Sequence, residues 1–303
     1  MNLDRLILFL QNINGIGDSA IRKLIICNCF NNFHPKNLED VLEFIKKHSI
    51  YFSKKSAIES LSMDDLKKAN EIRKQIEEKC ESLGIKYISY FSDEYPIRFK
   101  KMKDTKKYDF PLILFYKGDL NLLNSEKTCA ILGTRKPSEK AILIGQKITK
   151  KMTESGYVII SGLAEGCDTI GHRECLNAGG KTVAIVGTGL DTVFPKSNTD
   201  LLEEILQKDG LVISEYPVGF KGATYSFIQR DRLQAACSDI LIPIQTSIHG
   251  GTMHAARAGI NNYHNRVLVV SPKLVDDGDM SGNAFLIKEY FAKEIVSLDE
   301  FNL

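Results

Sequence analysis

The chain lacks the long apolar segment that a membrane-spanning helix needs. No hydrophobic run in its 303 residues approaches the ~20 residues required to cross a bilayer. The first residues, Met1 to Arg5, lack the basic start and the apolar stretch of a secretory signal. We therefore expect a cytoplasmic protein that has no membrane partner.

Cysteine and histidine are absent from the patterns that form disulfide frameworks or zinc sites. The seven cysteines are an odd number and are scattered along the chain, which suits a reducing cytoplasm. Cys27 and Cys29 are two residues apart but have no second pair, and the six histidines show no zinc-ligand spacing. We predict no metal site.

The chain also lacks a strong charge of either sign. Its formal net charge is +2, so any nucleic-acid binding must depend on a local basic patch. With 43% hydrophobic and 26% charged residues, the composition is that of an ordinary globular protein. The length allows one large domain and one small one.

What the chain does contain is a strand–helix–strand unit between residues 128 and 173. Two short apolar runs, Thr128–Leu132 and Tyr157–Ile160, are bounded by glycine and predict buried parallel strands. A helical pattern over Ser138–Glu154 lies between them. Each run ends in a loop of small residues, Gly133–Arg135 and Ser161–Asp168, placed just before a helix.

These two loops are candidate phosphate-binding loops. The N-terminus of a helix presents unpaired N–H groups and a partial positive charge, and glycine lets an anion approach the backbone. Arg135 adds a planar guanidinium that can bind a phosphate through two hydrogen bonds. The alternative is that the glycines only turn the chain between strand and helix. Two such loops in succession, one with an arginine, favour a phosphate or nucleotide site.

Residues 1–82 read as a small all-helical domain. Apolar residues recur at helical spacing before and after Asn14–Asp18, whose Gly-Ile-Gly turn is similar to those of helix-hairpin-helix and SAM-like modules. Such a turn can direct N–H groups at a DNA phosphate, but it can equally be a plain helix–helix corner. The lysines that follow are mixed with acidic residues and indicate a solvated face.

Residues 83–303 read as an α/β domain with a mainly parallel sheet. Further short apolar runs alternate with helical patterns and end in polar or glycine-rich loops, so ligands are expected at the carboxyl ends of the strands. Gly187-Thr188-Gly189 lacks the third glycine and the downstream acid of a dinucleotide fingerprint. We therefore predict no NAD or FAD cofactor.

Taken together, these motifs resemble those of the DprA/Smf family of bacterial DNA-processing proteins. Their order and spacing agree from about Ile85 to the end of the chain, and the helical N-terminal region also fits. The matching segments are Tyr95-Pro96, Gly133–Pro137, Ser161–Asp168 with His172, Gly179–Thr182, Gly187–Asp191, Phe194-Pro195, Ser214–Pro217, Phe227, Arg230, Arg232, Ser238-Asp239 and Gly282-Asn283.

The resemblance implies an extended Rossmann-like domain that binds single-stranded DNA without catalysis and without a cofactor. It also implies a homodimer that protects incoming DNA and loads a RecA-type recombinase in natural transformation. A C-terminal winged-helix module, carried by many members, is not expected, because the chain ends just after the Rossmann-like domain.

The residues expected to bind DNA phosphates come from the loops and from one basic segment. They are Gly133, Thr134, Arg135, Lys136, Ser161, Gly162, Gly166, Gly187, Gly189, Arg230, Arg232, Gly250, Gly251 and Thr252. Tyr225 and Phe227 are candidates to stack bases at ~1–3 kcal/mol each. Core packing is the favoured alternative for Phe227.

Two departures from the family pattern favour a second hypothesis. The family's Arg-Asn-Arg reads Arg230-Asp231-Arg232 here, which puts a carboxylate beside the expected phosphate site. The family's Ser-Gly-Ser-Leu loop reads His249–Met253, followed by His254. Its Gly-Gly-Thr resembles the phosphate loop of the Lonely Guy nucleotide phosphoribohydrolases.

The second hypothesis is therefore an N-glycosidase that acts on a nucleotide or on a base in DNA. A carboxylate would stabilise the oxocarbenium-like transition state and an acid would assist the leaving base. The candidates are Asp168, Glu215, Asp231 and His254. Asp168 can instead cap a helix and Glu215 can pair with an arginine, and His254 can be an ordinary surface histidine. A nucleotide-sized cavity lined by Asp231 and Glu215 would favour the enzyme. A nucleotide-sensing role in phage defence would use the same pocket.

Overall fold

Five helices form the N-terminal part of the chain. The computed structural model describes residues 1–104 and 107–298. The five helices are α1 (Leu3–Gln11), α2 (Asp18–Ile26), α3 (Leu38–Lys47), α4 (Lys55–Glu59) and α5 (Met63–Ser82). Local sequence explains their starts: Asn2 caps α1, and Ser62 and Asp65 form a reciprocal capping box on α5. The expected helical N-terminal part is present.

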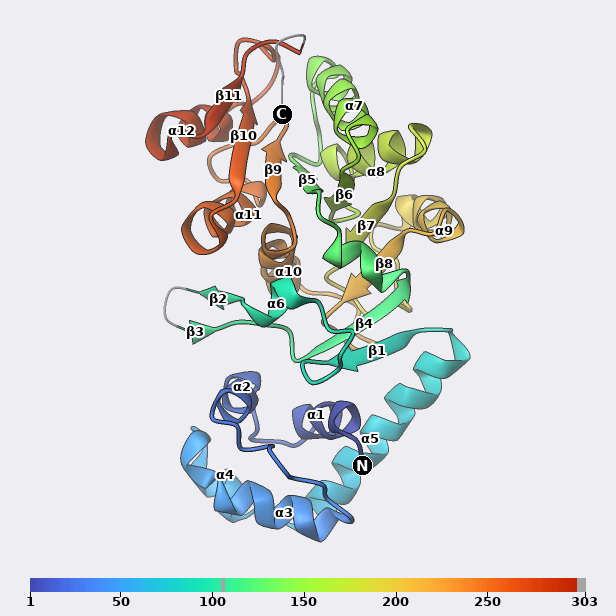
Figure 1. Cartoon of the computed structure of the whole chain (residues 1–303), viewed down its shortest axis with the longest axis vertical. Coiled ribbons are helices and arrows are strands. Elements are labelled where there is room, and N and C mark those ends of the chain that lie inside the picture. Colours follow the sequence, from blue (N-terminus) through green and yellow to red (C-terminus); the bar gives the residue numbers. More distant parts are fainter. Residues whose placement is uncertain (105–106, 299–303) are drawn as a thin grey trace.

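The rest of the chain is built on a nine-stranded, mostly parallel sheet (Figure 1), as expected. Its strands are β1 (Lys86–Ser89), β4 (Ile113–Gly118), β5 (Thr128–Leu132), β6 (Val158–Ser161), β7 (Thr182–Ile185), β8 (Leu211–Ser214), β9 (Ile240–Pro243), β10 (Arg266–Val270) and β11 (Lys293–Ile295). They lie in the order β1-β4-β8-β7-β6-β5-β9-β10-β11. The strands from β8 to β11 are parallel, and β1 and β4 are antiparallel to their neighbours. The strands β2 (Lys103–Asp104) and β3 (Lys107–Tyr108) pair antiparallel in a separate two-stranded sheet.

Helices cover both faces of this sheet. One layer contains α7 (Glu139–Glu154), α8 (Cys167–Asn177) and α9 (Thr199–Gln207), and the other contains α10 (Thr224–Ala236), α11 (Thr252–Ala258) and α12 (Ser281–Tyr290) (Figure 1). The short helix α6 (Ile97–Lys100) contacts α10. Alternate residues of each strand supply the two cores. In β5, Cys129 and Ile131 belong to the core under α7 and α8, whereas Ala130 and Leu132 belong to the core that includes α10 and α11.

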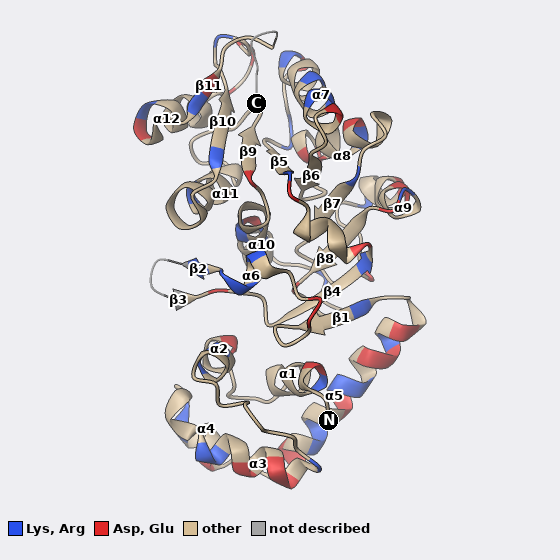
Figure 2. Cartoon of the chain, viewed as in Figure 1, with Lys and Arg blue, Asp and Glu red and all other residues tan. Residues whose placement is uncertain are grey.

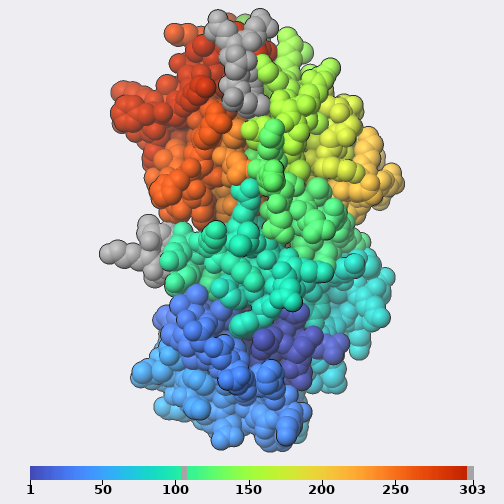
Figure 3. Space-filling view, in the orientation of Figure 1, coloured from blue at the N-terminus to red at the C-terminus, as the bar shows by residue number. Residues whose placement is uncertain are grey.

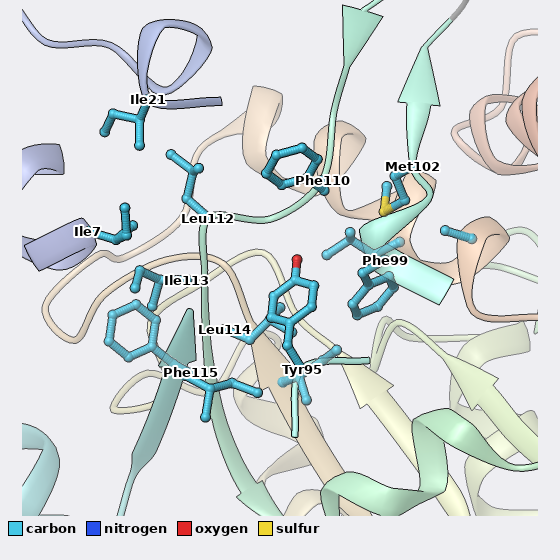
Figure 4. Close-up of a cluster of buried hydrophobic side chains, with 14 of the residues drawn as sticks. Ile7, Ile21, Tyr95, Phe99, Met102, Phe110, Leu112, Ile113, Leu114 and Phe115 are labelled. Atoms are coloured by element: carbon cyan, nitrogen blue, oxygen red, sulfur yellow. The ribbon is translucent and has the colours of Figure 1, made fainter. Parts of the chain in front are cut away.

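The helical N-terminal part and the sheet share one hydrophobic core. Ile7 of α1 and Ile21 of α2 approach Leu112 and Ile113 at the start of β4 (Figure 4). In the space-filling view the N-terminal residues, coloured blue, lie directly against the teal segment that contains β1 to β4 (Figure 3). The N–H of Ser89 donates to Asp4, and the helical part is therefore anchored by polar contacts as well as by apolar packing.

The strand order contains one reversal that determines where loops meet. The chain passes from β5 through β6 and β7 to β8 on one side, and then returns to place β9 on the other side of β5. In open parallel sheets, ligands bind outside the carboxyl ends of the strands at such a reversal. None of the described helices combines the length and the apolar character that crossing a membrane requires.

Candidate nucleic-acid interface

A large cavity lies at this reversal. Its volume is about 1060 Å³, and its walls are the loop after β5, the loop after β9, and one side of α10. We call it the main cavity. Its lining includes most of the loop residues that the sequence predicts to bind phosphate: Gly133, Thr134, Arg135, Lys136, Gly250, Gly251 and Thr252. The sheet therefore brings together two glycine-containing loops that are more than a hundred residues apart in the sequence.

The loop after β5 is held in place by the loop after β9. The N–H of Thr134 donates to the carbonyl of Gln245 at 2.7 Å, and the N–H of Lys136 donates to Thr134 Oγ1 at 3.2 Å. Arg135 and Lys136 are both exposed, and neither is ion-paired within the described part of the chain. Two cations at the wall of a cavity, neither of them in an ion pair, are available to an anionic ligand.

Sequence reasoning missed the polar residues that brace the far side of the main cavity. Gln245 accepts from the N–H of Ser138 at 2.8 Å and donates to the carbonyl of Asp277 at 3.0 Å. Ser138 caps α7 and also donates to Asp277 at 2.8 Å. The position of Gln245 in the sequence could have indicated this role. Gln245 follows the buried strand β9 by two residues and therefore lies at the carboxyl edge of the sheet.

Arg230 forms part of the floor of the main cavity and is buried, with 7% of its surface exposed. Its Nη2 lies 3.6 Å from Asp168, and its Nη1 donates to the carbonyl of Ile185 at 3.3 Å. Its Nε lies 3.3 Å from Asp231 Oδ1, but the N–H is not aimed at that oxygen, so this hydrogen is left without an acceptor. Arg230 is thus shared between two carboxylates and fully satisfied by neither.

Gly162 is required by the packing of Arg230. A Cβ at this position would overlap the Nη1 atom of Arg230. With its amide oxygen turned toward this loop, Gln234 accepts from the N–H of Gly162 at 2.9 Å and from Arg230 Nη1. Gly162 and Gly187 also line a small extension of the main cavity of about 50 Å³, together with Arg135, Phe227 and Arg230.

Two carboxyl groups at the floor of the main cavity have raised pKa values. Burial raises the pKa of Asp231 to about 7, even though Arg230 beside it favours the charged form. Burial also raises the pKa of Asp168, against the opposing effects of Arg230 and of the N–H groups of Ala164 and Gly162. Asp168 accepts hydrogen bonds from those two loop N–H groups, at 3.3 and 3.1 Å, and therefore braces the loop before α8.

Arg232 lies on the other side of α10, away from the main cavity. It donates to Glu215 at 2.5 and 2.7 Å and to Asp109 at 2.6 Å. Burial lowers the pKa of Arg232, but the paired carboxylates of Glu215 and Asp109 outweigh burial and raise it. Glu215 therefore does pair with an arginine, and neither residue lines the main cavity. The two line a different cavity, of about 550 Å³, between α10 and the N-terminal helices.

The remaining candidates lie in three kinds of place. His254 is exposed in a separate groove beside α11. Tyr225 is 58% exposed but lines the cavity of Glu215 and Arg232, whereas Phe227 is half-buried at the main cavity and packs 5.1 Å from Phe194. The last three, Ser161, Gly166 and Gly189, line none of the cavities described above.

These last three residues have packing roles in the structure; a Cβ at Gly189, for example, would overlap the carbonyl oxygen of Pro217. The hydroxyl of Ser161 donates to the carbonyl of Ile131 at 2.7 Å, which ties β6 to β5. Gly166 has φ +78, which side chains rarely adopt, and a Cβ there would also overlap the carbonyl of Thr134. His172 lies buried beneath the loops, and burial lowers its pKa to about 3, so it is neutral.

The lysines of the N-terminal helices are interspersed with acids along α3 and α5 (Figure 2). On α5, Lys67 lies 3.3 Å from Asp64 and Lys74 lies 2.8 Å from Glu71. Their charges are compensated locally, which contrasts with the uncompensated Arg135 and Lys136. Arg135 and Lys136 at the main cavity are therefore free to bind an anion, unlike these two lysines of α5.

Comparison with known proteins gives a consistent family match. A protein-family model described as DNA recombination-mediator protein A matches residues 86–302. DNA processing protein DprA of Streptococcus pneumoniae is 35% identical over 202 residues, which cover 67% of this chain and 68% of that protein. DNA processing protein DprA of Bacillus subtilis is 31% identical over 57% of this chain and 56% of its own length, so the chain spans about half of that relative.

Two solved structures are similar to this one. The X-ray structure of S. pneumoniae DprA aligns over 100% of both chains with a TM-score of 0.77 and 25% identity. The structure of DNA processing protein A of Helicobacter pylori, described for its single-stranded DNA binding mode, aligns over 71% of this chain and 94% of that chain. Its TM-score is 0.62 and its identity 29%.

Proposed function

Because the chain belongs to the DNA recombination-mediator protein A family, the DprA/Smf family, we propose that it binds single-stranded DNA in the main cavity. The observation that carries this proposal is the pair of uncompensated cations, Arg135 and Lys136, at the reversal of the sheet. Arg230 lies behind them and adds a guanidinium that its two carboxylates do not saturate. Backbone phosphates supply the matching negative charge.

Aromatic side chains at the same cavity favour a single strand over a duplex. Phe194 is 46% exposed, and its ring packs against that of Phe227, which lines the wall. The bases of a single strand are free to stack on such rings, at about 1–3 kcal/mol per base, whereas duplex bases are stacked on each other. We therefore place the phosphates of the strand at Arg135 and Lys136 and its bases toward Phe194 and Phe227.

In the cell, we propose that a homodimer protects incoming DNA and passes it to a RecA-type recombinase during natural transformation. The support is the family description as a recombination mediator and the naming of its relatives as DNA processing proteins. The dimer is tested by sedimentation of the free chain. The loading role is tested by the rate at which a RecA-type recombinase forms filaments on strands coated with this protein.

Strand binding is tested by fluorescence anisotropy of labelled single-stranded DNA over a series of salt concentrations. We expect steeply salt-dependent binding to the single strand and weaker binding to a duplex of the same length. Arg135→Ala is expected to weaken binding and to lower the slope of log Kd against log salt by about one unit, because one phosphate contact is lost.

The matched control is Arg266→Ala. Arg266 is exposed and begins β10, so it lies at the opposite edge of the sheet from the main cavity. The substitution Arg266→Ala removes the same charge as Arg135→Ala, and we expect it to leave the slope of log Kd against log salt unchanged. If both variants bind like the wild type, or if the two change equally, the phosphate role of Arg135 is wrong.

The glycosidase hypothesis keeps one supporting observation. Asp231 is a buried carboxyl in the main cavity, and its pKa of about 7 suits a general acid at neutral pH. Asp168 shares the cavity, but Glu215 is saturated by Arg232 and His254 lies elsewhere. An assay for abasic sites or released bases after the titration separates the two functions. Base release that is lost in Asp231→Asn would replace the binding proposal with the enzymatic one.

A further inference from the structure

A groove between α10 and α11 lies directly beside the main cavity. Its volume is about 340 Å³, and Ile228 of α10 lines both spaces. The α11 side of the groove is formed by His254 and Arg257, and the π-helical turn Gly259–Tyr263 that follows contributes Asn261 and Asn262. We call it the α10–α11 groove.

The charge of this groove comes from one arginine. Arg257 is not ion-paired within the described part of the chain, and its guanidinium lies 5.8 Å from the centre of the Phe285 ring. Such a cation–π contact holds the side chain without neutralising it. Arg232 and Asp109 also line the groove, but Arg232 is paired with both Asp109 and Glu215, so this cluster adds no free cation.

The residues of α11 lead from one space to the other. Thr252, its first residue, lines the main cavity, and Arg257 follows five residues later, which is about 7–8 Å along a helix axis. His254 and Arg257 are three residues apart and therefore lie on the same side of the helix. Neighbouring nucleotides of one strand can span this distance.

We propose that the α10–α11 groove is a second phosphate-binding site, which holds the nucleotides that come immediately after those in the main cavity. This inference rests on the proposed binding of single-stranded DNA. Arg257 binds a phosphate through its guanidinium, and His254, Asn261 and Asn262 add polar groups to the same wall. Ile228 is 41% exposed between the two spaces and offers apolar contact to a base or sugar.

The chemistry of this site fits a strand of any sequence. A guanidinium, an imidazole and two amides at the wall of a groove suit backbone oxygens. Tyr263 is the one phenylalanine or tyrosine ring in the described lining of this groove. The second site therefore lengthens the bound strand without selecting bases. The path of the strand follows α11, from its first turn to the π-helical turn beyond its end.

The test is a length series of labelled oligothymidylates, lengthened one nucleotide at a time, against the full chain. For the wild type, affinity is expected to rise with length and to show a step when the strand reaches the α10–α11 groove. Arg257→Ala is expected to match the wild type on the shortest strands. Beyond the step it should bind about tenfold more weakly, with a salt slope lower by about one unit.

Two further variants make the result specific. His254→Ala changes an exposed residue and is expected to give a smaller loss at the same lengths, which tests the groove even if Arg257→Ala is unstable. Arg266→Ala, exposed at the other edge of the sheet, is expected to match the wild type at every length.

The outcomes separate this inference from the proposed function. If the wild type binds but neither Arg257→Ala nor His254→Ala differs from it at any length, the second site is wrong and the main cavity stands. If both variants lose affinity equally at all lengths, the groove is not a separate site. If the wild type binds no strand of any length, the proposed function itself fails.

Discussion

Two arginines on α10 occupy opposite environments, although they are separated by a single residue. Arg232 donates five hydrogen bonds, four to Glu215 and Asp109 and one to the backbone carbonyl of Gln229. Arg230 has one backbone acceptor at 3.3 Å, the side-chain amide oxygen of Gln234, and two carboxylates whose geometry is poorer. Successive residues of a helix are turned by about 100°, so residues two apart face different sides.

The difference teaches that a matching motif does not establish the same role for each of its residues. Arg232 is saturated and ties α10 to the end of β8 and to the segment before β4, so its charge is not available to DNA. Arg230 faces the main cavity with an unsatisfied N–H and can turn toward a phosphate. We therefore keep the phosphate role for Arg230 and expect Arg232 to contribute to stability.

The largest expected effect is that of Arg232→Ala on folding. Removing one partner of a buried ion pair leaves Glu215, and with it Asp109, without compensation. We expect the free energy of unfolding to fall by about 3–5 kcal/mol. Urea denaturation of both proteins at one pH measures this change.

The control for Arg232→Ala is Lys67→Ala, which breaks an exposed pair with Asp64 and is expected to cost no more than about 1 kcal/mol. Anisotropy on the folded fraction completes the test, because the salt slope of strand binding is expected to stay at the wild-type value. A lower slope in Arg232→Ala would show that this arginine contacts phosphate after all.

The next effect depends on pH and concerns Asp231. The pKa of Asp231 is raised from 3.8 to about 7 in the folded chain. Its favourable contribution to the free energy of unfolding is therefore complete below pH 3.8 and is lost as the pH rises through about 7. Asp231→Asn removes this dependence. The free energy of unfolding of Asp231→Asn minus that of the wild type should therefore increase by up to about 3 kcal/mol between pH 5 and pH 8, at 1.36 kcal/mol per pH unit.

Urea denaturation at pH 5 and pH 8 checks this prediction. Asp279→Asn is the matched control, because Asp279 lines the same cavity but a hydrogen bond from Ser281 lowers its pKa. We expect no such gain between pH 5 and pH 8 for this control. A gain for Asp231→Asn that is equal at both pH values would show that Asp231 is ionised throughout, and that the raised pKa is wrong.

Local patterns were enough to predict the elements that hold the site. The run Thr128–Leu132 coincides with β5, and the helix expected over Ser138–Glu154 is α7 with Ser138 as its cap. Such predictions succeed because an apolar period, a capping residue and a glycine act within a few residues of one another. The mainly parallel sheet and the helical N-terminal part followed from the same patterns.

Contacts between distant residues could not be predicted in this way. Nothing near Gly250 indicates that β9 pairs with β5, which is what brings its loop to Gly133. Nothing near Arg232 indicates that Asp109, in the segment before β4, would lie 2.6 Å away. The helical period of α10 could have shown that Arg230 and Arg232 face different sides, but it could not have shown which side carries the cavity.

The smallest effect separates the two arginines by function. Arg230→Met removes a cation from the floor of the main cavity, and we expect strand affinity to fall about tenfold and the salt slope to fall by about one unit. Folding should suffer less than in Arg232→Met, because the raised pKa values of Asp231 and Asp168 let these carboxyls take up protons when their cation is lost. Anisotropy gives the salt slope of each variant, and urea denaturation gives its free energy of unfolding. The comparison holds if Arg230→Met changes mainly the slope and Arg232→Met mainly the stability, and it breaks if the two variants change both quantities alike.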